Sequence, residues 1–167
     1  MAVVATFAIA ADKIAETVAE IYNTSLVQPE LTPRSKEELL ALARGGNLAQ
    51  VYVDGKLAGW GAFEPLIKNV HEVGLVYIKP EYRTTEVFNA LMHVIGVRPE
   101  DKVAASYDPA YIRYVVRAWG GKYSSLAEVI WRSRGKFLTK RMNAASRKSI
   151  QNRMKDSKPK YVFIRGK

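Results

Sequence analysis

The spacing of apolar residues predicts an alternation of strands and helices along the chain. Short apolar runs bounded by Gly, Pro, Asn or Asp are typical of strands. They occupy residues 4–10, 48–53, 56–65, 70–80, 101–107, 122–133 and 161–165. The Asp54-Gly55 pair between the second and third runs is a strong hairpin signal, so we expect antiparallel strands on either side of it.

Apolar residues at helical spacing predict two helices between the first two strands. Asp12 is the expected N-cap of the first helix, which should end near residues 23–25. Ser35 and Glu38 form a capping-box pattern for the second helix, and the glycine pair 45–46 should end it.

Further helices are predicted in the second half of the chain. One covers about 84–95, and another begins after Asp108, the expected N-cap, with Pro109 at its first position. The basic stretch 136–156 carries one apolar stripe and predicts a helix as well. It lies between the last two predicted strands as an insertion.

This order of elements predicts the fold class. Strand, two helices, three strands, helix, strand, helix and two strands favour an α/β three-layer fold, a mixed and mostly antiparallel sheet flanked by helices. A basic helical segment at 136–156 and a closing strand at 161–165 complete it. The chain has 167 residues, so we expect a single domain spanning 1–167.

Composition excludes several classes of site. There is no cysteine, which excludes disulfides and cysteine-ligated metals. His71 and His93 are the only histidines, so we expect no metal site. The apolar start lacks a basic region and is soon followed by charges, and no apolar run approaches the roughly 20 residues of a membrane span. We therefore expect a cytoplasmic protein, or alternatively one packaged into a virion.

The positive charge is confined to the end of the chain. The net charge is +10. Residues 1–131 hold 13 Lys and Arg against 15 Asp and Glu, which gives −2, whereas residues 132–167 hold 13 against 1, which gives +12. Such a cluster is typical of a surface for nucleic acid, and equally of a solvated helix or a tail for an acidic partner protein.

Three stretches carry a family likeness. They read VDGKLAGWGAFEP at 53–65, VYIKPEYR at 76–83 and SYDPAYIRYVVRAWGGKY at 106–123. In these motifs, and in element order over roughly residues 4–132, the chain resembles the GCN5-related N-acetyltransferase (GNAT) superfamily. The resemblance implies an acyltransferase that uses acetyl-CoA and an amine substrate. It also implies a set of cofactor-binding residues: Val76, Tyr77, Ile78, Arg83, Thr84 and Thr85.

The cofactor loop departs from the family pattern. Arg83 matches its first position, but Thr84, Glu86 and Phe88 stand where glycines are usual. Bare amides cradle a pyrophosphate best, and a carboxylate beside phosphate costs free energy at an intermediate dielectric. Either the helix starts so that Glu86 is only a favourable first-turn acid, or the fold has been kept and the cofactor site lost.

Candidate catalytic residues follow from the same resemblance. The fourth helix of the family often carries a tyrosine that protonates the leaving thiolate, but the matching pair here is Tyr114-Val115. Tyr107, Tyr111 and Tyr114 remain candidates, with packing as the alternative role. A general base is expected near the start of the fourth strand, where Glu72 and His71 lie on opposite faces of the strand by alternation. Either could instead be a surface residue.

The basic segment supplies the candidate contacts for nucleic acid or for an acidic partner protein. They are Lys136, Lys140, Arg141, Arg147, Lys148, Arg153 and Lys155. Binding through such residues would depend on phosphate contacts and would weaken steeply with salt.

Two functions are therefore compatible with the sequence. One is a GNAT-like N-acyltransferase acting on an amine, with reduced activity if the altered loop weakens cofactor binding. The other is a non-catalytic GNAT-like structural protein of a bacteriophage, because YIRYVVRAWGGKY at 111–123 resembles a small internal virion protein of short-tailed phages. The oligomeric state cannot be read from the sequence.

Overall fold

The computed structural model describes residues 1–28, 31–140 and 158–166. The chain divides into two compact units. Unit 1 comprises Met1–Phe63 and Leu75–Arg98, and unit 2 comprises Glu64–Gly74 and Pro99–Lys167. The single domain expected from the length stays a prediction.

The strands form a mixed and mostly antiparallel sheet, which confirms the predicted fold class. They are β1 (Val3–Thr6), β2 (Leu48–Val53), β3 (Lys56–Ile67), β4 (Val70–Ile78), β5 (Asp101–Ser106), β6 (Lys122–Ser124) and β7 (Lys160–Ile164). Their order is β1-β2-β3-β4-β5-β7-β6. β4 and β5 pair in parallel, whereas β1–β2, β2–β3, β5–β7 and β6–β7 are antiparallel.

The helices are α1 (Ile14–Val27), α2 (Lys36–Arg44), α3 (Thr85–Gly96), α4 (Pro109–Trp119), α5 (Leu126–Arg132) and α6 (Lys136–Thr139), with 3-10 turns η1 (Ala11–Lys13) and η2 (Pro80–Tyr82). The capping box of Ser35 and Glu38 is present at α2, and Asp108 caps α4 as predicted. Asp54 and Gly55 both have positive φ, as a tight hairpin turn requires.

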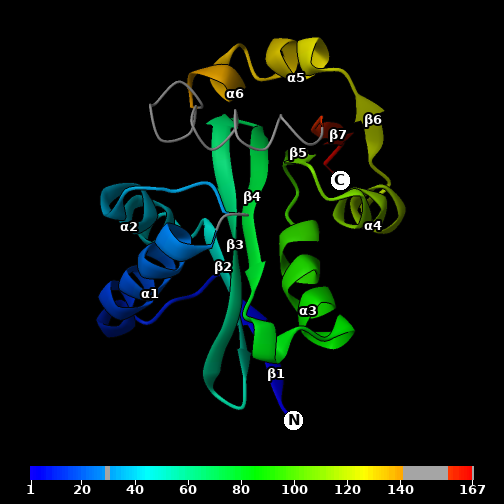
Figure 1. The fold of residues 1–167 in the computed structure, drawn as a ribbon. Coiled ribbons are helices and arrows are strands. Elements are labelled where there is room, and N and C mark those ends of the chain that lie inside the picture. Colours follow the sequence, from blue (N-terminus) through cyan, green and yellow to red (C-terminus); the bar gives the residue numbers. More distant parts are fainter. Residues whose placement is uncertain (29–30, 141–157, 167) are drawn as a thin grey trace. The chain divides into compact units, whose positions relative to one another are not determined.

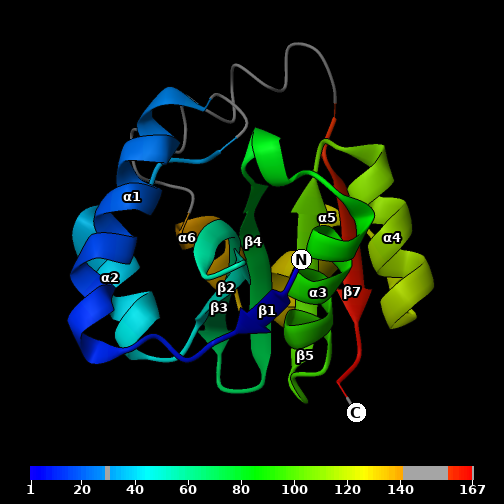
Figure 2. The same ribbon diagram turned by 90° about the horizontal axis from the view of Figure 1, so that it is seen from below.

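In unit 1, helices cover both faces of the strands. α1 and α2 lie on one side of β2 and β3, and α3 lies on the other (Figures 1 and 2). The side chains of Trp60 and Tyr77 join the core formed with α1 and α2. Gly61 faces the opposite way, where Ile95 and Leu91 of α3 fill the space that a side chain would take.

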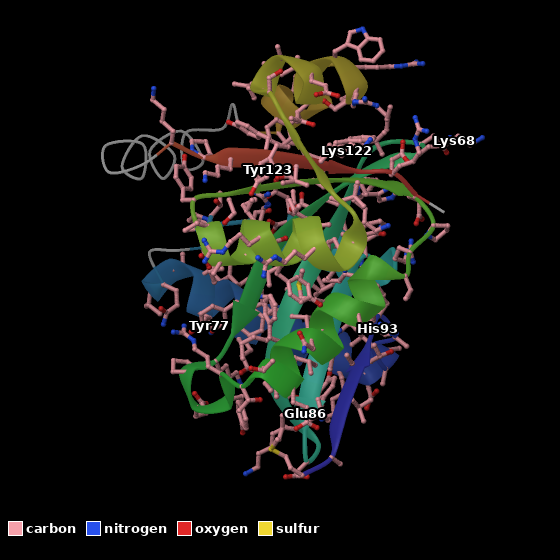
Figure 3. The ribbon with its side chains drawn as sticks, turned by 90° about the vertical axis from the view of Figure 1, so that its right-hand side faces the viewer. Lys68, Tyr77, Glu86, His93, Lys122 and Tyr123 are labelled. Atoms are coloured by element: carbon pink, nitrogen blue, oxygen red, sulfur yellow. The ribbon has the colours of Figure 1, made fainter. Side chains whose placement is uncertain are left out.

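In unit 2, α4 and α5 lie on opposite sides of β7 (Figure 3). Val129 of α5, Phe137 of α6 and Phe163 of β7 share one core with Val70 and Val103. On the other face, α4 ends at Gly120, and Gly121 packs so closely on Val162 that it leaves no room for a side chain.

Two local predictions were wrong. Asp12 does not cap α1, because the chain already turns in η1 and Asp12 lacks the extended backbone of an N-cap. α1 also runs past residues 23–25 to Val27, since the hydroxyl of Ser25 donates to Tyr22 O within the helix (2.7 Å) and so does not compete with it.

The run 122–133 is also not one strand. It is the short strand β6 followed by α5. Ser125 caps α5 by accepting a hydrogen bond from Glu128 N (3.1 Å). In the basic segment 136–156, α6 accounts for Lys136–Thr139, and residues 141–156 lie outside the described residues. The closing strand is confirmed as β7.

Candidate functional site

The backbone of β4 adopts an unusual conformation in the second half of the strand. Its parallel pairing with β5 covers Val70 to Val73. Leu75, which is buried, then has a φ of 53°, a region that residues with side chains seldom adopt. Such a conformation costs on the order of 1–3 kcal/mol and is concentrated at functional sites. The strain therefore draws attention to the three residues that follow, Val76 to Ile78.

Arg83 is tied to the end of β4. Its Nε donates to Ile78 O (3.1 Å), and its guanidinium lies 5.8 Å from the centroid of the Tyr77 ring. The amide of Lys79 donates to Ala58 O (2.9 Å). Successive residues of a strand direct their backbone groups to opposite edges, so Ile78 O points away from β3 and toward Arg83. The structure thus brings Tyr77, Ile78 and Arg83 together, and their role in binding a cofactor stays a prediction.

The start of α3 is built for anions. Thr84 is its N-cap, with an extended backbone and a hydroxyl that accepts from Val87 N (3.3 Å). The amides of Thr85 and Glu86 are first-turn donors that have no acceptor within a helix. Together with the helix dipole they favour a phosphate group.

The start of α3 shows where Glu86 and Phe88 lie relative to the cofactor loop. Glu86 lies on the first turn of α3 and is exposed (Figure 3), and the amide of Phe88 already donates to Thr84 O. Glu86 is therefore a first-turn acid, and Phe88 belongs to the helix, where its amide is not available to an anion. Because Glu86 is in water, its repulsion of a phosphate oxygen about 4 Å away costs about 1 kcal/mol, less than in a buried loop.

The two candidate bases are buried, so the surface alternative considered for them was wrong. Glu72 and His71 are 4% and 7% exposed. His71 is the β4 partner of Lys102, a buried lysine whose ammonium donates to Glu100 O (2.9 Å). The side chains of Glu72 and His71 are therefore both shielded from water.

Tyr111 is the tyrosine that the structure singles out. Its hydroxyl is buried and has no hydrogen-bond partner among the described residues. Burial first, and the charge of Glu72 second, raise the pKa of Tyr111 above its ordinary value. The group therefore stays protonated, as a donor without an acceptor in residues 1–28, 31–140 and 158–166. Such orphaned groups in a native structure call for an explanation, and a role toward a ligand is one.

Tyr114, the tyrosine favoured by sequence, lies elsewhere on α4. With Arg113 and Arg117 it lines a shallow depression of about 430 Å³ on the outer face of the helix. Its ring meets Trp119 edge to face, with 6.3 Å between centroids. Burial raises the pKa of Tyr114 as well. The helical period explains the difference, since Tyr111 and Val115 share the inner face.

Sequence reasoning missed Glu64. Its side chain in β3 is only 6% exposed, and Oε2 lies 3.1 Å from Nζ of Lys140. Lys140, a candidate contact for nucleic acid or a partner protein, therefore pairs with Glu64 through a side chain that is 31% exposed, and its role in such a contact stays a prediction. Lys136 is exposed. The other five candidates, Arg141, Arg147, Lys148, Arg153 and Lys155, lie outside the described residues. A lone carboxylate within an apolar strand was the signal for Glu64.

Solved structures with the same arrangement come from acetyltransferases. N-acetylglutamate synthase of Neisseria gonorrhoeae, in complex with coenzyme A and N-acetyl-glutamate, matches with a TM-score of 0.61 and 16% identity over 100% of this chain and 36% of its own. A GNAT-family acetyltransferase of Bacillus cereus matches with a TM-score of 0.61 and 12% identity over 100% and 99%. The chain has the GNAT fold.

The same holds for diaminobutyrate acetyltransferase of Paenibacillus lautus, in complex with L-2,4-diaminobutyric acid and coenzyme A. It matches with a TM-score of 0.60 and 11% identity over 99% of this chain and 95% of its own. No protein-family model and no curated protein matches the sequence. Structural similarity alone therefore supports the GNAT fold. The chain spans about a third of the length of the Neisseria synthase.

The described residues, 1–28, 31–140 and 158–166, form neither a metal-binding cluster nor a membrane-spanning helix. In this part of the GNAT fold, no three His, Asp or Glu side chains are grouped to hold a metal ion. None of its helices is both long enough and apolar enough to cross a membrane.

Proposed function

We propose that the protein is an N-acyltransferase that moves an acyl group from acyl-CoA to an amine. The observation that carries this proposal is the presence of two buried groups in unit 2 of a GNAT fold: Glu72, and the hydroxyl of Tyr111, which has no hydrogen-bond partner among the described residues. One group accepts protons and the other keeps its proton, which is the division of roles that acyl transfer to an amine requires.

The residues of unit 1 fit the cofactor. First-turn amides of Thr85 and Glu86 would hold the pyrophosphate, with Thr84 fixing the start of the helix. Arg83 stiffens the loop through Ile78 O, and the backbone of Val76 to Ile78 would align the pantetheine arm. Acetyl-CoA, when bound, supplies an acyl group activated as a thioester.

The residues of unit 2 would move the protons. A carboxylate oxygen of Glu72 takes a proton from the acceptor's ammonium, which frees the nitrogen lone pair for attack. Tyr111 Oη would supply the proton that the thioester sulfur takes as the carbon–sulfur bond breaks, and the second proton that the nitrogen loses as the amide forms would restore the phenol. His71, on the opposite face of β4, is the second candidate base. Removal of a well-placed acid or base of this kind lowers rates by ~10²–10⁴-fold.

Calorimetric titration with acetyl-CoA tests the cofactor half of the proposal. Wild-type protein should bind it, and Glu86→Gln should bind it up to about fivefold more tightly, because it removes roughly 1 kcal/mol of repulsion. Glu81→Gln is the matched control, an exposed acid of the same loop outside α3. Unchanged affinity in Glu86→Gln would contradict a pyrophosphate at this helix.

A non-catalytic role is the second candidate, because no glycine opens the loop between Pro80 and Val87. A virion component that has kept the GNAT fold without its chemistry would need neither cofactor nor acceptor. It would give no heat with acetyl-CoA even at millimolar concentration. The same titration therefore separates the two candidates.

A further inference from the structure

Glu64 and Glu72 approach the same face of β4. Residues two apart along a strand point to one face, so Glu72 shares its face with Gly74. Glu64 Oε1 lies 3.8 Å from where a side chain at Gly74 would begin. Glu64 therefore approaches the same face of β4 at a position two residues, or roughly 7 Å along the strand, from Glu72.

The carboxylate of Glu64 requires a cation. A buried carboxylate without a partner is costly, and the usual remedies are pairing with a cation or neutralisation. Among the described residues, the ammonium of Lys140, 76 residues away in sequence, pairs with it. An alkyl ammonium on a flexible stem is also what a protonated primary amine presents.

The position of Lys140 allows its side chain to move from Glu64 into water. It follows the last residue of α6, a helix of four residues anchored by buried Phe137. Its side chain is 31% exposed, against 6% for Glu64. Replacement of Lys140 by another ammonium would keep Glu64 paired and would move the lysine into water. Neither charge would be left buried and alone.

We propose that Lys140 is an internal occupant of the acceptor site: its ammonium holds Glu64 in the free protein, and a primary aliphatic amine displaces it on the way to Glu72. This inference rests on the proposed acyltransferase function and names its substrate class, alkyl ammonium compounds. Lys140, at the end of α6, would then compete with the amine acceptor and lower its apparent affinity. The apparent affinity for the amine equals its intrinsic affinity multiplied by the fraction of molecules in which the site is free.

The displacement can be measured on the wild-type chain without acetyl-CoA. Protein labelled with ¹³C at the lysine ε carbons is titrated with propylammonium chloride, against sodium chloride at equal ionic strength. The Lys140 signal, assigned from its loss in Lys140→Arg, should move toward the position of free lysine. The signal of Lys136, on the same helix and exposed, should stay. Equal shifts in both salts would overturn the proposal.

Variants give a second readout that distinguishes this inference from the proposed function. Calorimetry should show propylammonium binding at least about tenfold more tightly to Lys140→Met than to wild type, if Lys140 fills the site nine times in ten. Lys136→Met should match wild type, and Glu64→Gln should lose binding. Tighter binding without any acyl transfer would support the amine site and contradict the enzyme. Acyl transfer, together with wild-type affinity for propylammonium in a folded Lys140→Met protein, would support the enzyme and contradict Lys140 as an occupant of the acceptor site.

Discussion

Replacement of Tyr111 by phenylalanine separates a functional hydroxyl from a structural one. The change removes one oxygen and adds no atom, so it causes no overpacking. A buried polar group without a partner costs about 1–3 kcal/mol, and the hydroxyl of Tyr111 is such a group among the described residues. Tyr111→Phe should therefore leave the free energy of unfolding unchanged or raise it by up to that amount. For a chain of this size, each kcal/mol corresponds to about 2–4 °C in Tm.

Activity should respond in the opposite direction. If Tyr111 Oη donates the proton to the leaving sulfur, kcat should fall by ~10²–10⁴-fold while the affinity for acetyl-CoA is kept. Release of CoA can be followed with a thiol reagent, and the chain contributes no background because it has no cysteine. Thermal unfolding followed by circular dichroism gives Tm for the same samples.

Tyr114→Phe is the matched control on the same helix. Its ring lines the outer depression of α4, so its kcat should stay within a few fold of wild type. The reasoning is refuted if Tyr111→Phe lowers the free energy of unfolding by more than about 1 kcal/mol and keeps the wild-type kcat. That result would give the hydroxyl a structural partner and no role in transfer.

Three further outcomes are expected. Ser125→Ala should lower the free energy of unfolding by about 1 kcal/mol in urea denaturation, because it removes the cap of α5; no loss would mean that the cap is not formed in solution. Gly121→Ala should cost about 1–3 kcal/mol through its clash with Val162, and a neutral result would show that α4 can shift. Because the pKa of Tyr111 is raised in the folded state, its contribution to stability is complete below about pH 10 and is lost as pH rises above that value, by up to about 1.4 kcal/mol per pH unit. Tm measured from pH 9 to 11 should therefore fall less steeply in Tyr111→Phe, and parallel curves would contradict the shift.

Local signals in the sequence predicted the framework well. The Asp54-Gly55 turn, the Ser35 capping box and the Asp108-Pro109 start of α4 each fix backbone geometry through neighbouring residues alone. At residues 122–133 two local signals disagree: the apolar run favours a strand, whereas the capping pattern favours a helix. Ser125 and Glu128 marked the start of α5, yet the run 122–133 was read as a strand.

At the candidate site, only contacts between residues that are close in sequence could be predicted. Tyr77, Ile78 and Arg83 lie within seven residues, and their contacts follow from one strand and one turn. The pair of Glu64 and Lys140 spans 76 residues and depends on where α6 packs, which no local pattern encodes. Burial also decided between tyrosines on α4, because helical period places Tyr111 inward but does not show that its hydroxyl lacks a partner.

The measurement that tests the central claim most directly is acyl transfer by the purified chain. Acetyl-CoA is incubated with a panel of primary aliphatic amines, and CoA release and acetylated product are followed together for wild type, Glu72→Gln and the exposed control Glu81→Gln. The proposed function predicts a product with at least one amine, a ~10²–10⁴-fold loss in Glu72→Gln and no loss in the control. An equal rate in Glu72→Gln, or no product from a protein shown to bind acetyl-CoA and the amine, would contradict it.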